Sequence, residues 1–452
     1  MIPPASLFPP WVGILLVLSA LAGLMLGLRL YQQIYSPHPE WVRKLLHIGM
    51  GLVTLSFPWL FDSPIPVIAL AIAAIAFLGG IKLISPLRDR LGSVTGGVAR
   101  TSWGEIYFPI SVALVFVFAD GNLVCYLVPL LILTLADAVA ALIGIGYGFH
   151  TYSTSEGGKS AEGSIAFFTV AFLSTHIPVL LLTDTGRAES LLMAIIIGLQ
   201  VMVLEAIAWQ GLDNLFIPLG GLIMVKLFLP MGIPALGFRV ILTLILGTLT
   251  LSLRHRTTLN DSAVLGSAWL GYLTWVLRSW HWFIPPAILF AAYSLWCPWT
   301  QRYKQRRHDM RAVLSIGITG MFWLLLAKTG QLGDASLYFY PYTVTFAAHL
   351  ALIDIAVPQI HPQLPTIDFI GQSVVKAWGL LFFPFVLMQG WSQHTLMLTG
   401  VAFLLVVAIA LTFAGVQKQW RHQSKETWMW ASRSAIVTIG SAIGLWVNLS
   451  LG

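Results

Sequence analysis

Long apolar runs, separated by short polar connections, cover the chain from end to end. Most of them are close to the roughly 20 residues that a helix needs to cross a bilayer. The runs do not alternate polar and apolar positions, which favours helices over strands. Because only helices and closed barrels satisfy their backbone polar groups in lipid, we predict an all-α polytopic bundle of about fifteen or sixteen transmembrane helices. The predicted helices are 11–30, 45–61, 65–84, 105–119, 122–144, 164–183, 188–208, 215–230, 237–253, 263–277, 282–297, 313–328, 336–356, 373–389, 394–415 and 434–450.

The composition supports the same class. Hydrophobic residues make up 57% of the 452 residues and charged residues 10%, where a soluble domain has roughly 25% charged residues. So few charges cannot cover the surface of a soluble fold of this length. A soluble enzyme, a disordered chain and a nucleic-acid-binding domain are therefore excluded.

Lysine and arginine concentrate in every second connection, including 31–44, 82–104 and 145–163. The positive-inside rule places these connections on the cytoplasmic side and the N-terminus outside. Nearly all polar motifs fall within residues 1–230, whereas residues 231–452 form long apolar segments with two basic loops. We therefore expect two domains, 1–230 and 231–452.

Two polar motifs lie in the first domain, one at the start of the second predicted helix and one before the fourth. WVRKLLH contains Arg43, Lys44 and His47, and TSWGEIYFP contains Glu105. The two bases alone could be a positive-inside anchor, and Glu105 could be an acidic residue that interacts with a helix N-terminus. His47 lies on the same helical face as Arg43, one turn into the membrane, and an anchor does not explain it.

The most informative segment runs from LTLADAVAALIGIGYG to GGKSAEGS. Asp137 lies inside an apolar helix among small residues, and Lys159, Ser160 and Glu162 open the next helix. A lysine, a serine and free amides at a helix N-terminus suit a phosphate group, and carboxylates suit Mg²⁺. A P-loop is rejected because Ser153 stands where its first glycine belongs and no strand is expected before the loop. A glycine-rich connection without chemistry is the alternative.

A further motif, LEAIAWQGLDNLFIPL, contains Glu205 inside a helix and then Asp213 and Asn214. The segment Gly-Leu-Asp-Asn could be an ordinary turn, but a turn does not explain Glu205. Together, the carboxylates and the cations predict a metal–polyphosphate site at a membrane surface. Such a site suits phosphoryl transfer to an amphiphilic acceptor.

The order RKLLH, WGE, ADAVAALIGIGYG, GKSAEGSIAFF, and a glutamate followed by DNLFIPL resembles the phytol kinase and dolichol kinase family over about residues 40–225. The resemblance implies CTP-dependent phosphorylation of a long-chain isoprenoid alcohol with Mg²⁺ as cofactor. Phytol, geranylgeraniol, farnesol and a polyprenol all remain open as the acceptor. We expect a bacterial inner or photosynthetic membrane as the location, with the site on the cytoplasmic side.

The resemblance and the motifs together give the expected role of each residue. We expect Asp137, Lys159 and Glu162 to be catalytic, with Asp137 accepting the hydroxyl proton unless it is a metal ligand. The nucleotide would contact Arg43, Lys44, Lys159, Ser160, Asp213 and Asn214. The metal ligands would come from Asp137, Glu162, Glu205 and Asp213, and His47 and Glu105 would support the site.

The second domain weakly resembles the phytyl-phosphate kinase family in NDSAVLGSAWLGYLTW, in the basic loop near Arg311 and at Asp354. In that family the aspartate segment continues with Thr, Ser-Glu and Gly, but here Ile355, Val357 and Pro358 follow. We therefore expect a helical domain without catalysis, and a divergent second kinase is the alternative. For the whole chain, a CDP-lipid-forming cytidylyltransferase and a membrane transporter are the competing hypotheses.

Overall fold

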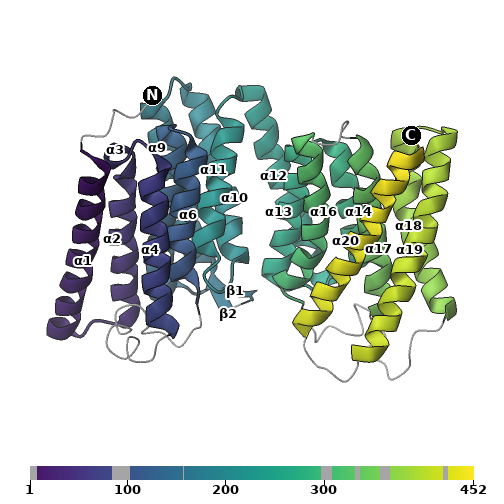
Figure 1. Cartoon of the computed structure of the whole chain (residues 1–452), viewed down its shortest axis with the longest axis horizontal. Coiled ribbons are helices and arrows are strands. Elements are labelled where there is room, and N and C mark those ends of the chain that lie inside the picture. Colours follow the sequence, from purple (N-terminus) through teal and green to yellow (C-terminus); the bar gives the residue numbers. More distant parts are fainter. Residues whose placement is uncertain are drawn as a thin grey trace. The chain divides into compact units, whose positions relative to one another are not determined.

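The computed structural model describes residues 8–83, 102–155, 157–296, 308–330, 336–356, 367–420 and 426–451. Within these ranges the chain is helical apart from two short strands and the connections (Figure 1), as predicted. It divides into two compact units, Met1–Leu244 and Ile245–Gly452. The division falls inside helix α12 (Ile233–Leu253), whereas the sequence motifs place it at residue 230.

Nine of the described helices are long and apolar enough to cross a membrane. They run from α1 (Pro10–Tyr35) to the part of α20 at Trp430–Leu451, and two shorter apolar helices cover Pro64–Gly80 and Gly104–Ala119. Many large apolar side chains on these helices are exposed, among them Leu26 and Leu404. Lipid covers such surfaces without cost, so the chain is an integral membrane protein. Which side of the membrane each connection faces stays a prediction. Most residues of the basic connections 82–104 and 301–312 lie outside the described residues.

Unit 1 is built around one continuous helix. This helix consists of α7 (Leu123–Leu131), the π-helical turn η1 (Ile132–Ala136) and α8 (Asp137–Tyr147), and it packs against α2, α6, α9 and α11. The remaining elements are α2 (Pro39–Leu55), α3 (Phe57–Leu60), α4 (Pro64–Leu83), α6 (Gly104–Ala119), β1 (Thr151–Thr154), β2 (Gly157–Ser160), α9 (Ala161–Leu182), α10 (Arg187–Ile207) and α11 (Asp213–Phe228). Pairs of successive helices run in opposite directions, so the ends that carry the predicted site meet at one end of the bundle (Figure 1).

The second helix differs from its predicted bounds of 45–61. It begins at Pro39, whose fixed φ suits the first helical turn. It ends at Leu55, and the single turn α3 follows. Pro58 has no amide donor and lies in the first turn of α3, where a helix does not need one. The WVRKLLH motif, predicted at the start of this helix, therefore lies entirely inside it.

The expectation that no strand precedes GGKS is wrong. Strands β1 and β2 form an antiparallel hairpin in which Thr151 pairs with Ser160 and Thr154 with Gly157. GGKS is itself the strand β2, so its backbone does not form a phosphate-binding loop. Ser160 ends the strand and caps α9, because its hydroxyl accepts a hydrogen bond from the Gly163 amide at 3.1 Å. Four-residue polar strands carry almost no hydrophobic period, so no pattern in the sequence indicates them.

Unit 2 has its core around α17 (Ser336–Ala356), which is buried along nearly its whole length. Two buried tyrosines tie α17 to its neighbours: the Tyr340 hydroxyl donates to the Leu398 carbonyl and the Tyr342 hydroxyl to the Trp282 carbonyl. The other elements are η2 (Arg254–Arg256), α13 (Asp261–Leu277), α14 (Trp280–Trp296), α16 (Met310–Thr329), α18 (Ile367–Gln389), α19 (Gln393–Trp420) and α20 (Glu426–Leu451).

Candidate active site

A buried ion pair joins α2 to α8. The Lys44 ammonium, whose side chain is 4% exposed, donates to the Asp137 carboxylate at 2.7 Å and to the Asp137 carbonyl oxygen at 3.3 Å. His47 lies one turn further along α2. Its Nε2–H donates to the Leu133 carbonyl at 2.9 Å, and this nitrogen is 3.5 Å from the same carboxylate. A buried carboxylate needs such partners, so α2 holds Asp137 in place as an anion.

The π-helical turn η1 places Asp137 toward α2. Turns of this kind inside α-helices are frequent at functional sites. Helix α2 approaches η1 closely because Gly51 packs against Thr134, and a Cβ at Gly51 would overlap the threonine side chain. The hydrophobic pattern did not predict this turn. Pro129, which removes one amide donor from the preceding α7, is the local sequence signal that could have indicated it.

Arg43 lies on the surface side of the same cluster. Its guanidinium donates to Glu40, one turn earlier on α2, at 2.8 and 3.0 Å. The arginine side chain is 47% exposed, so solvent screens this pair. Arg43 also interacts electrostatically with Asp137. A half-exposed guanidinium held near a buried carboxylate can turn toward an arriving anion at little cost.

A second lysine–carboxylate pair lies on the other side of the site. Lys159, on β2, donates to the Glu205 carboxylate at 2.7 Å and makes a short hydrogen bond to the Glu205 backbone carbonyl. Burial lowers the pKa of Lys159, but the carboxylates of Glu205 and Asp213 outweigh this effect and raise it above the ordinary lysine value. The ammonium is therefore a fixed positive charge at neutral pH.

Asp213 and Asn214 open α11 after a tight turn. The backbone amide of Asn214 donates to the Asp213 carboxylate at 3.0 Å. Gly211, in the turn, has a φ of +83°, which glycine tolerates. The Trp103 amide donates to the Gln210 carbonyl at 3.0 Å and joins this turn to the start of α6. The sequence allowed this segment to be an ordinary turn, and its turn geometry is what positions Asp213.

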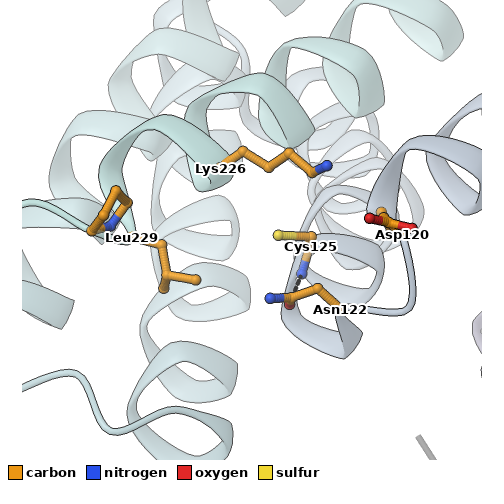
Figure 2. A pocket seen from close by; sticks show the side chains of 7 residues that line it. Asp120, Asn122, Cys125, Lys226 and Leu229 are labelled. Atoms are coloured by element: carbon orange, nitrogen blue, oxygen red, sulfur yellow. Dashed lines mark hydrogen bonds between the residues drawn. The ribbon is translucent and has the colours of Figure 1, made fainter. Parts of the chain in front are cut away.

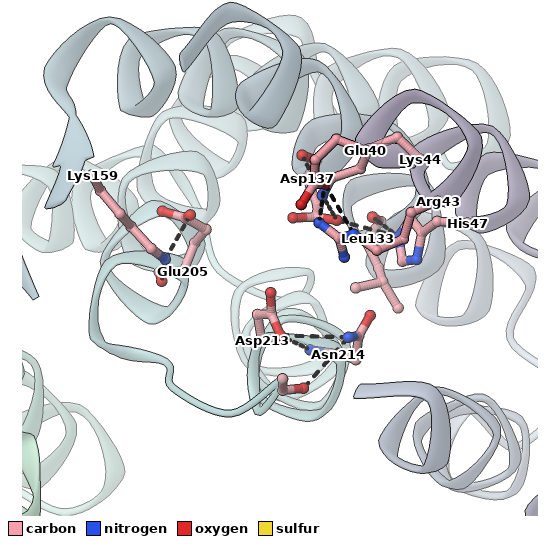
Figure 3. A network of polar contacts seen from close by, with 11 residues as sticks. Glu40, Arg43, Lys44, His47, Leu133, Asp137, Lys159, Glu205, Asp213 and Asn214 are labelled. Atoms are coloured by element: carbon pink, nitrogen blue, oxygen red, sulfur yellow. Dashed lines mark hydrogen bonds and ion pairs between the residues drawn. The ribbon is translucent and has the colours of Figure 1, made fainter. Parts of the chain in front are cut away.

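Figure 3 shows the three groups together: the Lys159–Glu205 pair on one side, the Asp137 cluster on the other, and Asp213 with Asn214 between and below them. Asp213 interacts electrostatically with both Lys159 and His47. It has no ion-pair partner within 4 Å in the part of the chain that the structure describes. Eight of the predicted site residues thus lie around one end of the bundle: Arg43, Lys44, His47, Asp137, Lys159, Glu205, Asp213 and Asn214.

Three other predicted residues have different surroundings. Glu162 accepts a hydrogen bond from His150 at 2.6 Å. His150 directly precedes the hairpin, and its side chain is largely exposed. Ser160 caps α9, as described above. Glu105 lies in the first turn of α6, next to Gly104, and Gly104 is packed against the Asn214 side chain.

The four predicted metal ligands do not form one cluster. Within the described ranges no three His, Cys, Asp or Glu side chains come together as a ready-made metal site. Mg²⁺, however, is usually bound through one or two carboxylates together with substrate phosphates and waters. Asp213, which has no cation within 4 Å among the described residues, fits that requirement, and the presence of Mg²⁺ remains a prediction.

Exposed aromatic residues surround this end of unit 1. Trp41, Trp103, Tyr147 and Phe149 all have exposed side chains. They lie in or next to the helix ends that carry the site residues. Tryptophan and tyrosine are enriched at the level of the lipid headgroups. The aromatic residues thus indicate that the polar site lies at a membrane–water interface.

A separate cavity of about 470 Å³ lies elsewhere in unit 1, and Figure 2 shows the side chains that line it. Asp120, Asn122, Cys125 and Lys226 line it, at the connection between α6 and α7 and the end of α11. Lys226 is thirteen residues beyond Asp213 on the same helix, which corresponds to roughly 20 Å along its axis. None of the predicted site residues contributes to this cavity.

The comparison with known proteins gives one informative match. The phytol kinase of Synechocystis sp. is 30% identical to this chain over 214 residues, which make up 47% of this chain and 89% of that protein. The chain belongs to the phytol kinase family. The match confirms the resemblance seen in the sequence motifs, over part of the chain.

Other comparisons add nothing to the family assignment. No protein-family model matches the chain, and no solved structure matches it. More than half of the chain lies outside the match to the Synechocystis phytol kinase. The weak resemblance of residues 231–452 to phytyl-phosphate kinases therefore stays a prediction. In that unit Asp354 is paired with Lys376 at 3.0 Å.

Proposed function

We propose that this member of the phytol kinase family is a membrane kinase that transfers the γ-phosphate of CTP to the hydroxyl of a long-chain isoprenoid alcohol. One observation supports the proposal most strongly. Two positioned lysines and Asp213, which has no cation within 4 Å among the described residues, surround one end of the bundle, where exposed aromatic side chains support a place near the lipid headgroups. There a polar donor from water and an amphiphilic acceptor from the bilayer can meet.

In the proposed reaction the alcohol oxygen forms a bond to the γ-phosphorus, the bond from that phosphorus to the β-phosphate oxygen breaks, and CDP leaves. Lys159 and Arg43 bind the phosphate oxygens and stabilise the charge that develops on them. The hydroxyl proton passes to the Asp137 carboxylate. Asp213, with Asn214 beside it, would hold Mg²⁺, which neutralises phosphate charge when it is bound.

The choice of CTP follows from the family resemblance of the motifs, and the acceptor is assigned only as a class. The test uses purified full-length protein in detergent with [γ-³²P]CTP, Mg²⁺ and a panel of phytol, geranylgeraniol, farnesol and a polyprenol. Labelled ATP, GTP and UTP are compared as donors. We expect label in a lipid monophosphate, with CTP as the best donor.

Three variants make the test specific. Asp137→Asn and Asp213→Asn remove one site carboxylate each without changing its shape, and both should abolish labelling. Asp354→Asn is the matched control, because it removes a lysine-paired carboxylate in unit 2 and should leave monophosphate formation intact. Absence of labelled lipid with every acceptor and donor would refute the kinase proposal. Pyrophosphate release from CTP with phosphatidate would then indicate a cytidylyltransferase.

A further inference from the structure

Glu205 holds Lys159 through two different oxygen atoms. Its side-chain Oε1 accepts from the ammonium at 2.7 Å, and its own backbone carbonyl accepts a second, short hydrogen bond. An ammonium group has three donors. Two of them are used by one residue of α10, so the position of the ammonium is fixed and one N–H remains for a ligand.

The hairpin that carries Lys159 needs such an attachment. An isolated two-stranded hairpin is marginally stable at best in water. Tyr152 pairs with Lys159 across the hairpin, and its hydroxyl is 2.9 Å from the Ser164 hydroxyl on α9. Because Tyr152 and Lys159 are directly opposite each other, their side chains lie on the same face of the hairpin, and they attach it to α9 and to Glu205 of α10.

The two carboxylates on this side of the site differ in their partners. Glu205 is already bound to an ammonium, and its side chain is 14% exposed. A metal ion at Glu205 would have to share this carboxylate with the ammonium, and the two positive charges would repel each other. Asp213 interacts with Lys159 and His47 only at longer range, within the described residues. Of the two, Asp213 is the one that can bind a metal without loss of an ion pair.

We propose that Glu205 is a positioning residue, which holds the Lys159 ammonium where the terminal phosphate of the donor binds, and that it is not a metal ligand. This inference rests on the proposed function, since it assumes a phosphorylated donor at this site. It differs from the role that the sequence motifs suggest for Glu205.

The experiment measures equilibrium binding of CTP and of Mg²⁺, so that it does not depend on turnover. Wild type, Glu205→Gln, Lys159→Met, the double variant and Asp213→Asn are compared as full-length proteins in detergent. Glu189→Gln, at the opposite end of the same helix, is the matched control. Gel filtration and thermal unfolding show which variants are folded, and Glu205→Asp, which keeps the carboxylate, should restore part of the CTP affinity.

We expect Glu205→Gln and Lys159→Met each to weaken CTP binding about tenfold or more. The double variant should be no weaker than Lys159→Met alone, because both changes remove the same interaction. The Mg²⁺ concentration for half-saturation should change less than about twofold in Glu205→Gln. It should rise about tenfold or more in Asp213→Asn, and a tenfold change corresponds to a loss of about 1.4 kcal/mol in binding free energy.

Two results would overturn the inference: a Mg²⁺ requirement in Glu205→Gln that rises as far as in Asp213→Asn, or losses of CTP affinity that add in the double variant. Wild-type protein that binds Mg²⁺ and CTP in this pattern but transfers no phosphate would refute the proposed reaction and uphold the role of Glu205. Wild-type protein that binds no CTP would refute both.

Discussion

Removal of Lys44 tests the buried ion pair that organises the site. In Lys44→Met the Asp137 carboxylate loses its 2.7 Å partner and keeps His47, at 3.5 Å, as the nearest group that could carry a positive charge. Loss of one partner from a buried pair costs about 3–5 kcal/mol. Because the Asp137 side chain is still 14% exposed and His47 remains, we expect the lower end, about 3 kcal/mol.

The expected loss of unfolding free energy corresponds to a measurable fall in the Tm. For a domain of about 150–250 residues, 1 kcal/mol changes the Tm by roughly 2–4 °C, so Lys44→Met should lower the Tm by roughly 6–12 °C. The assay is thermal unfolding of the purified protein in detergent. Lys226→Met is the control, because it removes an exposed lysine in the same unit that has no ion-pair partner among the described residues. It should stay within about 0.5 kcal/mol of wild type.

A second variant separates the ion pair from simple loss of packing. The combination Lys44→Met with Asp137→Leu removes both charges, and apolar replacement of a buried pair is often neutral or stabilising. The double variant should therefore regain most of the lost stability, although it should have no activity. A stabilising role for the ion pair is excluded if Lys44→Met unfolds within about 0.5 kcal/mol of wild type, or if the double variant is as unstable as the single one.

Three further predictions concern stability. Gly51→Ala pushes a methyl group into the π-helical turn and should cost about 1–3 kcal/mol, whereas Gly79→Ala, with nothing within 4 Å of the added atom, should be neutral or stabilising in the same thermal assay. Ser160→Ala removes the cap of α9 and should cost about 1 kcal/mol in denaturant titration, a loss that Ser160→Asn should not cause. The raised pKa of Lys159 means that its stabilising contribution is complete below the ordinary value of 10.5 and disappears as the pH rises through the folded-state value. The Tm of wild type should therefore fall more steeply above about pH 10 than that of Lys159→Met, and equal slopes would contradict this assignment.

The apolar runs by themselves determined the fold class. Long non-alternating segments with few charges can satisfy their backbone only as helices in lipid, so the all-α membrane bundle follows without any tertiary information. The motifs were also sufficient to identify the family and to predict the eight residues that gather at one end of unit 1. Helices that alternate in direction bring every second connection to the same side, so polar residues near those connections meet regardless of packing details.

The partners of those residues depended on the tertiary structure. All four predicted metal carboxylates are acidic residues in or beside apolar helices, and the sequence offers no means to distinguish them. The structure pairs Asp137 with Lys44, Glu205 with Lys159 and Glu162 with His150, and it leaves Asp213 without a close cation among the described residues. The Lys44–Asp137 and Lys159–Glu205 pairs join residues 93 and 46 positions apart, so they depend on which elements touch, and composition and spacing do not contain that information.

Local backbone geometry was the other feature that only the structure decided. The hairpin from Thr151 to Ser160 and the π-helical turn before Asp137 are both short, and neither changes the hydrophobic period of its surroundings. Their stability comes from contacts with distant elements: Tyr152 with α9, Lys159 with α10, and α2 against the π-helical turn. A pattern of hydrophobic positions specifies which segments cross the membrane, because burial in lipid acts on each segment separately. The positions of the charged groups are specified by contacts between segments, and those form only when the bundle is assembled.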